Sequence, residues 1–234
     1  MATYVGTSGY AYKEWKGAFY PAKLPAAEML RFYAGRLPTV EINNTFYRMP
    51  TERVLVDWAD QVPEGFRFVL KAPQRITHFA RLKLEDDSLD YFLRTANVMA
   101  GKLGPTLFQL PPNFKKDVGL LSEFLALLPP KVTAAFEFRN PSWLGDDVYA
   151  CLQERNLALC IADSETRDTP IITTADYAYL RLRDEGYTPD DVRRWGDTAR
   201  ELAMRCRDVF VYFKHEDEGK GAAFGTLMRE HLAQ

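Results

Sequence analysis

The segment "VEINNTFYRMP", residues 40–50, begins like a β-strand and continues as a polar loop. Val40 and Ile42 alternate with Glu41 and Asn43, and a period of two is typical of a strand whose two faces differ. In a parallel sheet covered by helices the outer face is apolar. Val40 and Ile42 are therefore expected to face helices, and Glu41 and Asn43 the opposite side. Amide, hydroxyl, aromatic and guanidinium groups follow directly, which is the composition of a strand that ends at a site.

This kind of segment recurs along the chain. Short β-type runs cover residues 3–9, 39–43, 66–71, 106–110, 133–139, 157–163, 177–182 and 208–214. Helix-type segments with apolar residues at helical spacing lie between most of them. A run that starts again every ~20 to 40 residues corresponds to one βα unit each.

Eight such units predict an α/β fold, a TIM-type (β/α)8 barrel formed by one domain, residues 1–234. The segment after Asp163 is too short and too broken for a full helix, so the barrel is expected to be irregular around strands six to eight. The alternative is an open doubly wound sheet. It has little support, because no G-x-G-x-x-G follows the first strand.

Composition limits the classes of function. The formal net charge is -2, which disfavours a broad nucleic-acid surface but allows a local basic cleft. The beginning, "MATYVGTSGY", lacks a signal-peptide pattern, and no apolar run reaches the ~20 residues of a membrane span. The three cysteines have no C-x-x-C spacing. These features predict a cytoplasmic protein without a membrane partner, and they leave the oligomeric state open.

Polar residues gather near the ends of the β-type runs, where barrel enzymes keep their sites. Side-chain alternation assigns the following residues to the inner face: Glu41, Asn43, Lys71, Gln109, Glu137, Arg139, Asp163, Tyr179, Arg181, Tyr212 and Lys214. The set is slightly positive and is expected to attract an anion. The alternative is a ring of ion pairs that fixes strand register without chemistry.

The loops add further candidates. Tyr10, Thr45, Tyr47 and Trp143 supply aromatic and hydroxyl groups for a small-molecule pocket, and His78 is a candidate proton carrier. Oxygen ligands from Glu41, Glu137 and Asp163 could hold Mg²⁺ or Mn²⁺. No spacing is diagnostic of a metal, so no metal or other cofactor is predicted. The glycine-rich "GKGAAFG", residues 219–225, is expected to open the last helix, and by itself it is a weak phosphate motif.

Six motifs occur in order: "GTSGYAYKEWKGAFYP", "VEINNTFYRMP", "FVLKAPQRITH", "LFQLPPNF", "FEFRNPSW" and "CIAD". Together they resemble the YecE-like family, a bacterial and archaeal family of unknown function, over nearly the whole chain. The resemblance implies a TIM barrel and no established activity. It implies shared polar positions at Glu41, Asn43, Thr45, Tyr47, Lys71, Thr77, His78, Gln109, Glu137, Arg139, Trp143, Asp163 and Arg181.

The last third departs from the family pattern. Arg183, in "RLRDEG", stands where the family has a histidine. The end of the eighth strand is "FKHED" instead of phenylalanine and two asparagines, and "AAFG" replaces the usual start of the last helix. The positions of the seventh and eighth strands that depart from the pattern are therefore not carried over from the resemblance, and neither is a family phosphate site there.

The function expected from these residues is that of an enzyme, a hydrolase or isomerase, acting on an anionic or sugar-like small molecule. Glu137 would be the general acid or base, with Lys71 and Arg139 keeping it ionised or binding the anion. Asp163 or Glu41 would be the second carboxylate. The alternatives are a barrel that binds nucleic acid or processes phosphodiesters, and a metabolite-binding protein without catalysis.

Overall fold

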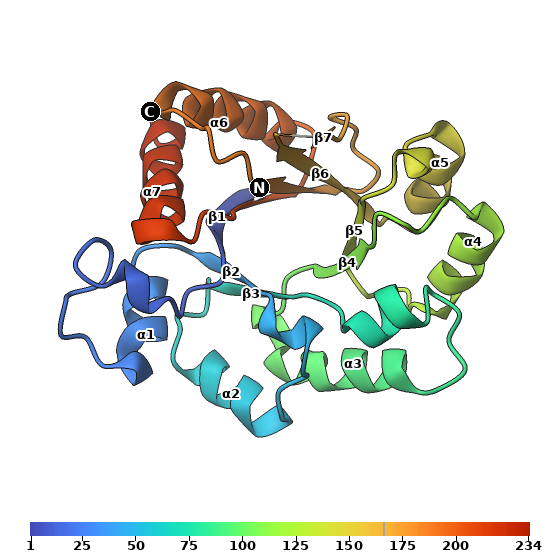
Figure 1. Cartoon of the computed structure of the whole chain (residues 1–234), viewed down its shortest axis with the longest axis horizontal. Helices are drawn as coiled ribbons and strands as arrows, with labels where there is room; N and C mark the ends of the chain where they lie inside the picture. The colour runs from blue at the N-terminus through green and yellow to red at the C-terminus, as the bar shows by residue number, and fades with distance from the viewer. Residues whose placement is uncertain (166) are drawn as a thin grey trace.

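The computed structural model, which describes residues 1–165 and 167–234, places eight parallel strands in a ring with helices around it (Figure 1). Each strand coincides with one of the β-type runs of the sequence. The strands are β1 (Ala2–Ser8), β2 (Thr39–Ile42), β3 (Arg67–Leu70), β4 (Thr106–Leu110), β5 (Ala134–Phe138), β6 (Ala158–Ser164), β8 (Tyr177–Leu182) and β9 (Asp208–Phe213). The predicted TIM-type barrel is therefore confirmed.

The ring closes because β1, the first strand, pairs with β2 on one side and with β9, the last strand, on the other. Its weakest joint lies between β3 and β4. There the described residues form two isolated bridges, Phe68–Leu103 and Lys71–Leu107, instead of a continuous ladder. The amide of Ala72 donates to the carbonyl oxygen of Leu107 over 2.8 Å. We call this joint the β3–β4 seam.

Helices cover the outside of the ring (Figure 1). They are α1 (Met29–Ala34), α2 (Glu52–Asp60), α3 (Ser88–Ala96), α4 (Val118–Leu127), α5 (Asp146–Glu154), α6 (Pro189–Ala203) and α7 (Lys220–Leu232). Their starts follow local chemistry. At α6, the Thr188 side chain accepts from the Asp191 amide and the Asp191 carboxylate accepts from the Thr188 amide, a capping box ahead of Pro189. None of the helices in the described residues is long and apolar enough to cross a bilayer.

The expected irregularity follows β6. A two-residue strand β7 (Arg167–Asp168) returns antiparallel to β6. In the described part of the connection between β6 and β8 there is no α-helix. The Thr174 hydroxyl ties the connecting segment to β6, donating to Leu157 O and accepting from the Leu159 amide, each over 2.7 Å. The outer face of β6 is consequently covered by this segment and by α6.

The barrel interior changes from apolar at the amino ends of the strands to charged at the carboxyl ends. Tyr4 stacks on Phe210 with ring centroids 4.9 Å apart, and Tyr179 lies against Tyr212 at 5.2 Å. Small residues on the facing strands leave room for these rings and for Arg181 one step further along β8. The small inner residues are Ala135, Ala158, Cys160 and Ala162. Large and small side chains thus fill the barrel together.

Gly6 of β1 is required by close packing inside the ring. A Cβ built on Gly6 would lie 2.0 Å from the carbonyl oxygen of Thr39 on β2, well inside van der Waals contact. We expect Gly6→Ala to lower the free energy of unfolding by about 1–3 kcal/mol or more, because the backbone of two paired strands would have to shift. Urea denaturation measures this. Gly65→Ala is the matched control, since a Cβ there meets nothing within 4 Å; equal losses in the two variants would contradict the packing argument.

Candidate active site

Arg181, from β8, occupies the centre of the barrel near its carboxyl-terminal mouth. One guanidinium nitrogen donates to Glu41 Oε1 of β2 over 2.7 Å, and the other donates to Glu137 Oε2 of β5. Arg181 and Glu41 are 1% and 0% exposed, and Glu137 is 3% exposed. Burial opposes ionisation of Arg181, but the two carboxylates outweigh it and raise the pKa of Arg181 well above its usual value. The group therefore stays charged.

Glu41 is held by two further donors. The Ser8 hydroxyl donates to Oε1 over 2.7 Å, and the Tyr179 hydroxyl donates to Oε2 over 2.5 Å. Burial and the neighbouring Glu41 charge raise the pKa of Tyr179, so the phenol keeps the proton that it donates. Both oxygens of Glu41 are consequently engaged by protein groups.

Glu137 is surrounded by cations. Besides Arg181, Arg139 donates to its Oε1 over 3.2 Å and Arg183 lies 3.7 Å from the same oxygen. Gln109 donates to Oε2 over 2.7 Å. Burial favours the neutral acid, but the charges of Arg181, Arg139 and Arg183 outweigh burial and hold the pKa of Glu137 far below its usual range. Glu137 is therefore a permanent anion at physiological pH.

Lys71 follows β3 on the same side of the barrel. Its ammonium donates to Gln109 Oε1 over 2.8 Å and lies 4.0 Å from the centre of the Phe46 ring. No carboxylate among the described residues forms an ion pair with it. Burial, together with the charge of Arg181, lowers the pKa of Lys71 to about 8. Lys71 is thus a cation whose protonation state changes near physiological pH.

His78 completes this side of the mouth. Its ring lies at nearly a right angle to the Phe46 ring at a centroid distance of 4.8 Å, and Nδ1 lies 2.9 Å from the Thr77 hydroxyl. Burial and the nearby charges of Lys71 and Arg139 lower the pKa of His78, so the imidazole is neutral at physiological pH. The imidazole and the Lys71 ammonium thus share Phe46 as a neighbour.

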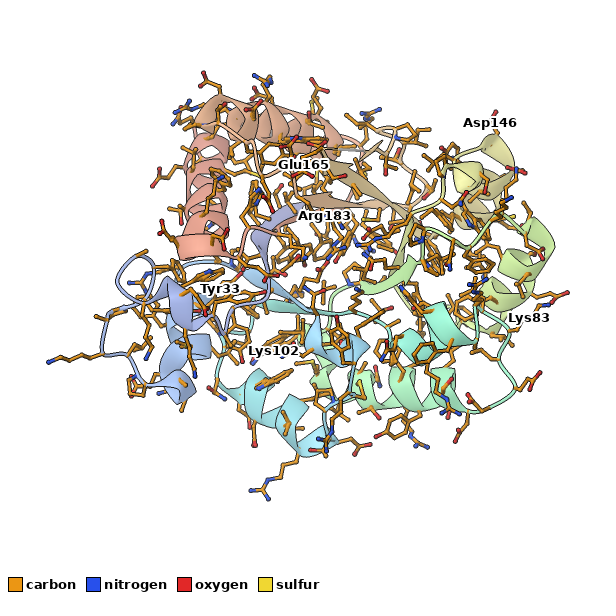
Figure 2. The ribbon with its side chains drawn as sticks, viewed as in Figure 1. Tyr33, Lys83, Lys102, Asp146, Glu165 and Arg183 are labelled. Atoms are coloured by element: carbon orange, nitrogen blue, oxygen red, sulfur yellow. The ribbon has the colours of Figure 1, made fainter. Side chains whose placement is uncertain are left out.

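Cations gather at the mouth. Among the described side chains, Lys71, Arg139, Arg181 and Arg183 lie around the carboxylates of Glu41 and Glu137. The side chains of Arg139 and Arg183 are 30% and 25% exposed, unlike the buried Arg181. Figure 2 shows Arg183 within the ring of strands, whereas the labelled Lys83 and Asp146 lie at the periphery. Both outer guanidinium groups are therefore partly accessible at the opening.

Six of the residues predicted at the strand ends lie together in one network: Glu41, Lys71, Gln109, Glu137, Arg139 and Arg181. Thr45 is buried beside them and supports the backbone, since its hydroxyl lies 2.7 Å from the Lys71 carbonyl oxygen. Asn43 and Tyr10 instead line a separate cavity of about 110 Å³ over the ends of β1 and β2. Tyr47 is 74% exposed.

The predicted position of Asp163 is wrong. On β6, Cys160 and Ala162 pack inside the barrel, so Asp163 points outward toward α6. Its Oδ2 accepts from the Tyr187 hydroxyl and, over 3.1 Å, from Trp195 Nε1. Asp163 therefore ties α6 and the loop before it to the end of β6, and the second carboxylate of the mouth is Glu41.

The assignment of Trp143 to a ligand pocket is also wrong. Trp143 is fully buried in the outer layer, where it stacks on Phe138 at 5.0 Å and donates to the Phe114 carbonyl oxygen over 2.7 Å. Phe138 alternates with Glu137 and points away from the interior. Trp143 consequently packs between β5 and the helical layer and is remote from a ligand at the mouth.

Two members of the network, Ser8 and Arg183, are missing from the inner-face set that alternation assigned. Ser8 is the last residue of β1 and shares the inner face with Gly6, so alternation could have found it. Arg183 lies just beyond β8, in phase with Arg181. Its position was visible only as a departure from the family pattern, and in the structure it adds a cation beside Glu137.

Other hollows lie away from this network. A cavity of about 730 Å³ is bounded by α3 and by the amino ends of β4 and β5, with Leu89, Leu93, Gly104 and Thr133 among its lining residues. Within residues 1–165 and 167–234 no group of three or more His, Cys, Asp or Glu side chains is arranged to hold a metal ion. "GKGAAFG" opens α7 as expected, but Lys220 is occupied with the Glu185 carbonyl oxygen at 2.8 Å.

Comparison with known proteins places this barrel among relatives. The model of the family described as "Protein of unknown function DUF72" matches residues 4–234. The chain belongs to the DUF72 family. The UPF0759 protein YunF of Bacillus subtilis is 27% identical over 98% of this chain and 94% of its own length. The UPF0759 protein YecE of Escherichia coli K12 is 34% identical over 49% of this chain and 42% of its own length. The YecE-like resemblance is thus confirmed.

Solved DUF72 structures share the fold. A DUF72 protein of Thermotoga maritima superimposes with a TM-score of 0.90 at 26% identity, covering 100% of both chains. One from Enterococcus faecalis gives a TM-score of 0.84 at 20% identity, covering 99% of this chain and 96% of its own. The DUF72 names carry no activity, so any function has to be argued from the mouth residues.

The charge network predicts a specific dependence of stability on pH. Because the pKa of Glu137 is lower in the folded than in the unfolded chain, its ionisation stabilises the fold above pH ~4.3 and this stabilisation is lost as the pH falls further. We expect Glu137→Gln to cost about 3–5 kcal/mol at pH 7, because Arg181 loses a buried partner. The difference from wild type should shrink steadily between pH 5 and pH 3.

Denaturant titrations at several pH values measure this difference. The control is Glu64→Gln, whose carboxylate is 96% exposed beside Lys102; it should cost less than about 1 kcal/mol at every pH. A Glu137→Gln penalty that stays constant down to pH 3 would show that the carboxylate is not ionised through its contacts with the arginines.

Proposed function

We propose that the barrel mouth is the active site of an enzyme that acts on an anionic small molecule, a carboxylate or a phosphate ester of sugar-like size. The observation that carries the proposal is the group of cations gathered at the mouth, Lys71, Arg139, Arg181 and Arg183, with Arg139 and Arg183 partly exposed at the opening. A cleft with low-dielectric walls concentrates the field of such charges and raises the local concentration of anions. Guanidinium groups also match carboxylate and phosphate geometry.

The roles differ from those that the sequence suggested. Glu137, ionised far below neutral pH, is too weak a base for proton transfer and acts as a counter-ion for the arginines. The groups suited to acid–base work near pH 7 are Lys71, with a pKa of about 8, and the neutral imidazole of His78. Both meet Phe46. Charge on the substrate would be stabilised by Arg139 and Arg183, so the proposal requires no metal ion.

Anion binding is the first test. We expect calorimetric titration to detect binding of at least one of inorganic phosphate, citrate and pyruvate, but not of glucose. In the double variant Arg139→Gln/Arg183→Gln the affinity should fall about ten-fold or more, because charged hydrogen bonds of ~1.5–3 kcal/mol are lost. Thermal unfolding of the variant checks that the fold is retained.

Arg48→Gln is the matched control for this titration. Arg48 is an exposed arginine in the loop after β2, and its removal should change the affinity less than about two-fold. Equal loss in both variants would indicate attraction by overall charge, and unchanged binding in the double variant would sink the proposed site. Binding without turnover of any anion would favour a metabolite-binding protein over an enzyme.

Exposed aromatic rings favour a second candidate, a surface for single-stranded nucleic acid. Tyr47 and Phe79 are 74% and 73% exposed on the loops after β2 and β3, and Arg48, Arg75 and Lys83 lie in or close to the same loops. Aromatic stacking of bases beside a basic groove is how sequence-tolerant binding is achieved. Arg75, however, is already paired with Asp86 at 2.5 Å, which reduces the free positive charge.

An oligonucleotide titration separates the two candidates. If nucleic acid is the ligand, a fluorescent single-stranded oligonucleotide should bind at low salt, with an affinity that falls steeply as salt rises. Tyr47→Ala should then weaken binding by roughly 1–3 kcal/mol. We expect instead no binding at 50 mM salt; saturable binding that requires Tyr47 would overturn the small-molecule assignment.

A further inference from the structure

Lys71 is a buried lysine that forms no ion pair with a carboxylate of the described residues. Only 9% of its surface is exposed, and the two carboxylates of the network are engaged by Arg181, Arg139 and Arg183. Burying an ammonium group without a carboxylate is costly, and the cost falls when the group loses its proton. A lysine kept in this position against a stability cost is therefore a candidate for chemistry that needs the free amine.

Gln109 fixes the environment of this amine. Glu137, as an ionised carboxylate, can only accept, so the amide nitrogen of Gln109 must point to Glu137 and its oxygen to Lys71. Lys71 thus donates to the neutral Gln109 oxygen at 2.8 Å, and the Glu137 carboxylate lies on the far side of that amide. A neutral acceptor orients the nitrogen without the strong stabilisation of the ammonium form that a carboxylate would give.

Groups next to Lys71 also favour the uncharged form of its amine. The Phe46 ring covers the amine on one side at 4.0 Å, and the charges of Arg181 and Arg139 oppose a further positive charge. With a pKa of about 8, roughly a tenth of the Lys71 amine is uncharged at pH 7, whereas an ordinary lysine with a pKa of about 10.4 is uncharged in fewer than about one molecule in a thousand. The free amine is the nucleophilic form.

We propose that Lys71 is a nucleophile that forms a Schiff base with an anionic aldehyde or ketone whose carboxylate or phosphate is bound by Arg139 and Arg183. This inference rests on the proposed function of the mouth as an anion site. It narrows the substrate class to carbonyl compounds that carry a negative charge. The cations of the mouth would then act together, since Arg139 and Arg183 hold the anion while Lys71 reacts.

The covalent step is balanced without a further reactant. The lone pair of the uncharged Lys71 nitrogen attacks the carbonyl carbon, a C–N bond forms, and the carbonyl π electrons move to oxygen. Proton transfer from nitrogen to oxygen gives a neutral carbinolamine. Protonation of its hydroxyl and departure of water leave a protonated imine, which withdraws electrons from the neighbouring carbon. Hydrolysis reverses the sequence and restores the amine, so no oxidant or reductant takes part.

Reductive trapping tests the proposal. The full-length protein is incubated at pH 7 with pyruvate, a small anionic ketone, and sodium cyanoborohydride, which reduces an imine to a stable secondary amine. Peptide mapping by mass spectrometry then locates the carboxyethyl group. We expect Lys71 to be labelled more than about a hundred-fold faster than the exposed Lys83 and Lys131 of the same chain, in line with its larger fraction of free amine.

Variants and a neutral probe define the controls. Lys71→Arg keeps a cation and should abolish labelling at this position without unfolding the protein. In Arg139→Gln/Arg183→Gln, labelling of Lys71 by pyruvate should slow about ten-fold or more, whereas labelling by acetone, a neutral ketone, should change less than three-fold. Labelling spread evenly over all lysines, or unaffected by removal of the arginines, would overturn the proposal.

The same experiment separates this inference from the proposed function. If pyruvate binds in the calorimeter and the double arginine variant loses that binding, yet no adduct forms at Lys71, the anion site stands and the nucleophile is wrong. If none of the three anions binds and Lys71 is still labelled selectively by both ketones, the amine is reactive but the anion site is wrong. If no anion binds and Lys71 is not labelled, both the anion site and the nucleophile are wrong.

Discussion

The contact on which this barrel depends is the bridge from Arg181 to Glu41 and Glu137. The three side chains come from β8, β2 and β5, which are separated around the ring, so one guanidinium group links strands that share no backbone ladder. Each charge would be very costly in the barrel interior alone, and the cost is offset only while all three are present with their further donors. Arg181, Glu41 and Glu137 therefore stabilise one another only in this arrangement.

This requirement decides which groups remain for function. The buried Arg181 contacts both carboxylates. Lys71 forms no ion pair with a described carboxylate, and Arg183 lies 3.7 Å from Glu137 at the partly exposed edge of the network. The ion pairs around Arg181 form the structural core of the network, and the cations at its edge are the groups to which we assign anion binding. The two interpretations of the strand-end residues describe different parts of one network.

Much of this network follows from the sequence by alternation alone. Where Phe136 and Phe138 fix the outer face of β5, the inward position of Glu137 was correctly predicted. Asp163 shows the limit of this reasoning. It continues the outward phase of Leu159 and Ile161, but a carboxylate on an outer face contradicts the apolar rule, and its partners come from distant positions, Tyr187 in the loop after β8 and Trp195 in α6. Trp143 shows another limit, because a loop aromatic can cover the core or meet a ligand and only tertiary packing decides.

The β3–β4 seam gives the site a mechanical property of its own. Lys71 and Gln109, the donor and acceptor that define the amine's environment, stand on opposite sides of the joint that lacks a continuous ladder. On the β2 side, the Lys71 backbone is held by the Ile42 carbonyl oxygen at 3.1 Å and by the Thr45 hydroxyl. Small opening motions of the barrel would therefore separate Lys71 from Gln109 rather than from Phe46. Elsewhere in the ring, backbone ladders resist such motion. The Lys71 ammonium therefore lies beside the joint of the described ring that lacks a continuous ladder, and a molecule bound to groups on both sides of that joint would link β3 to β4.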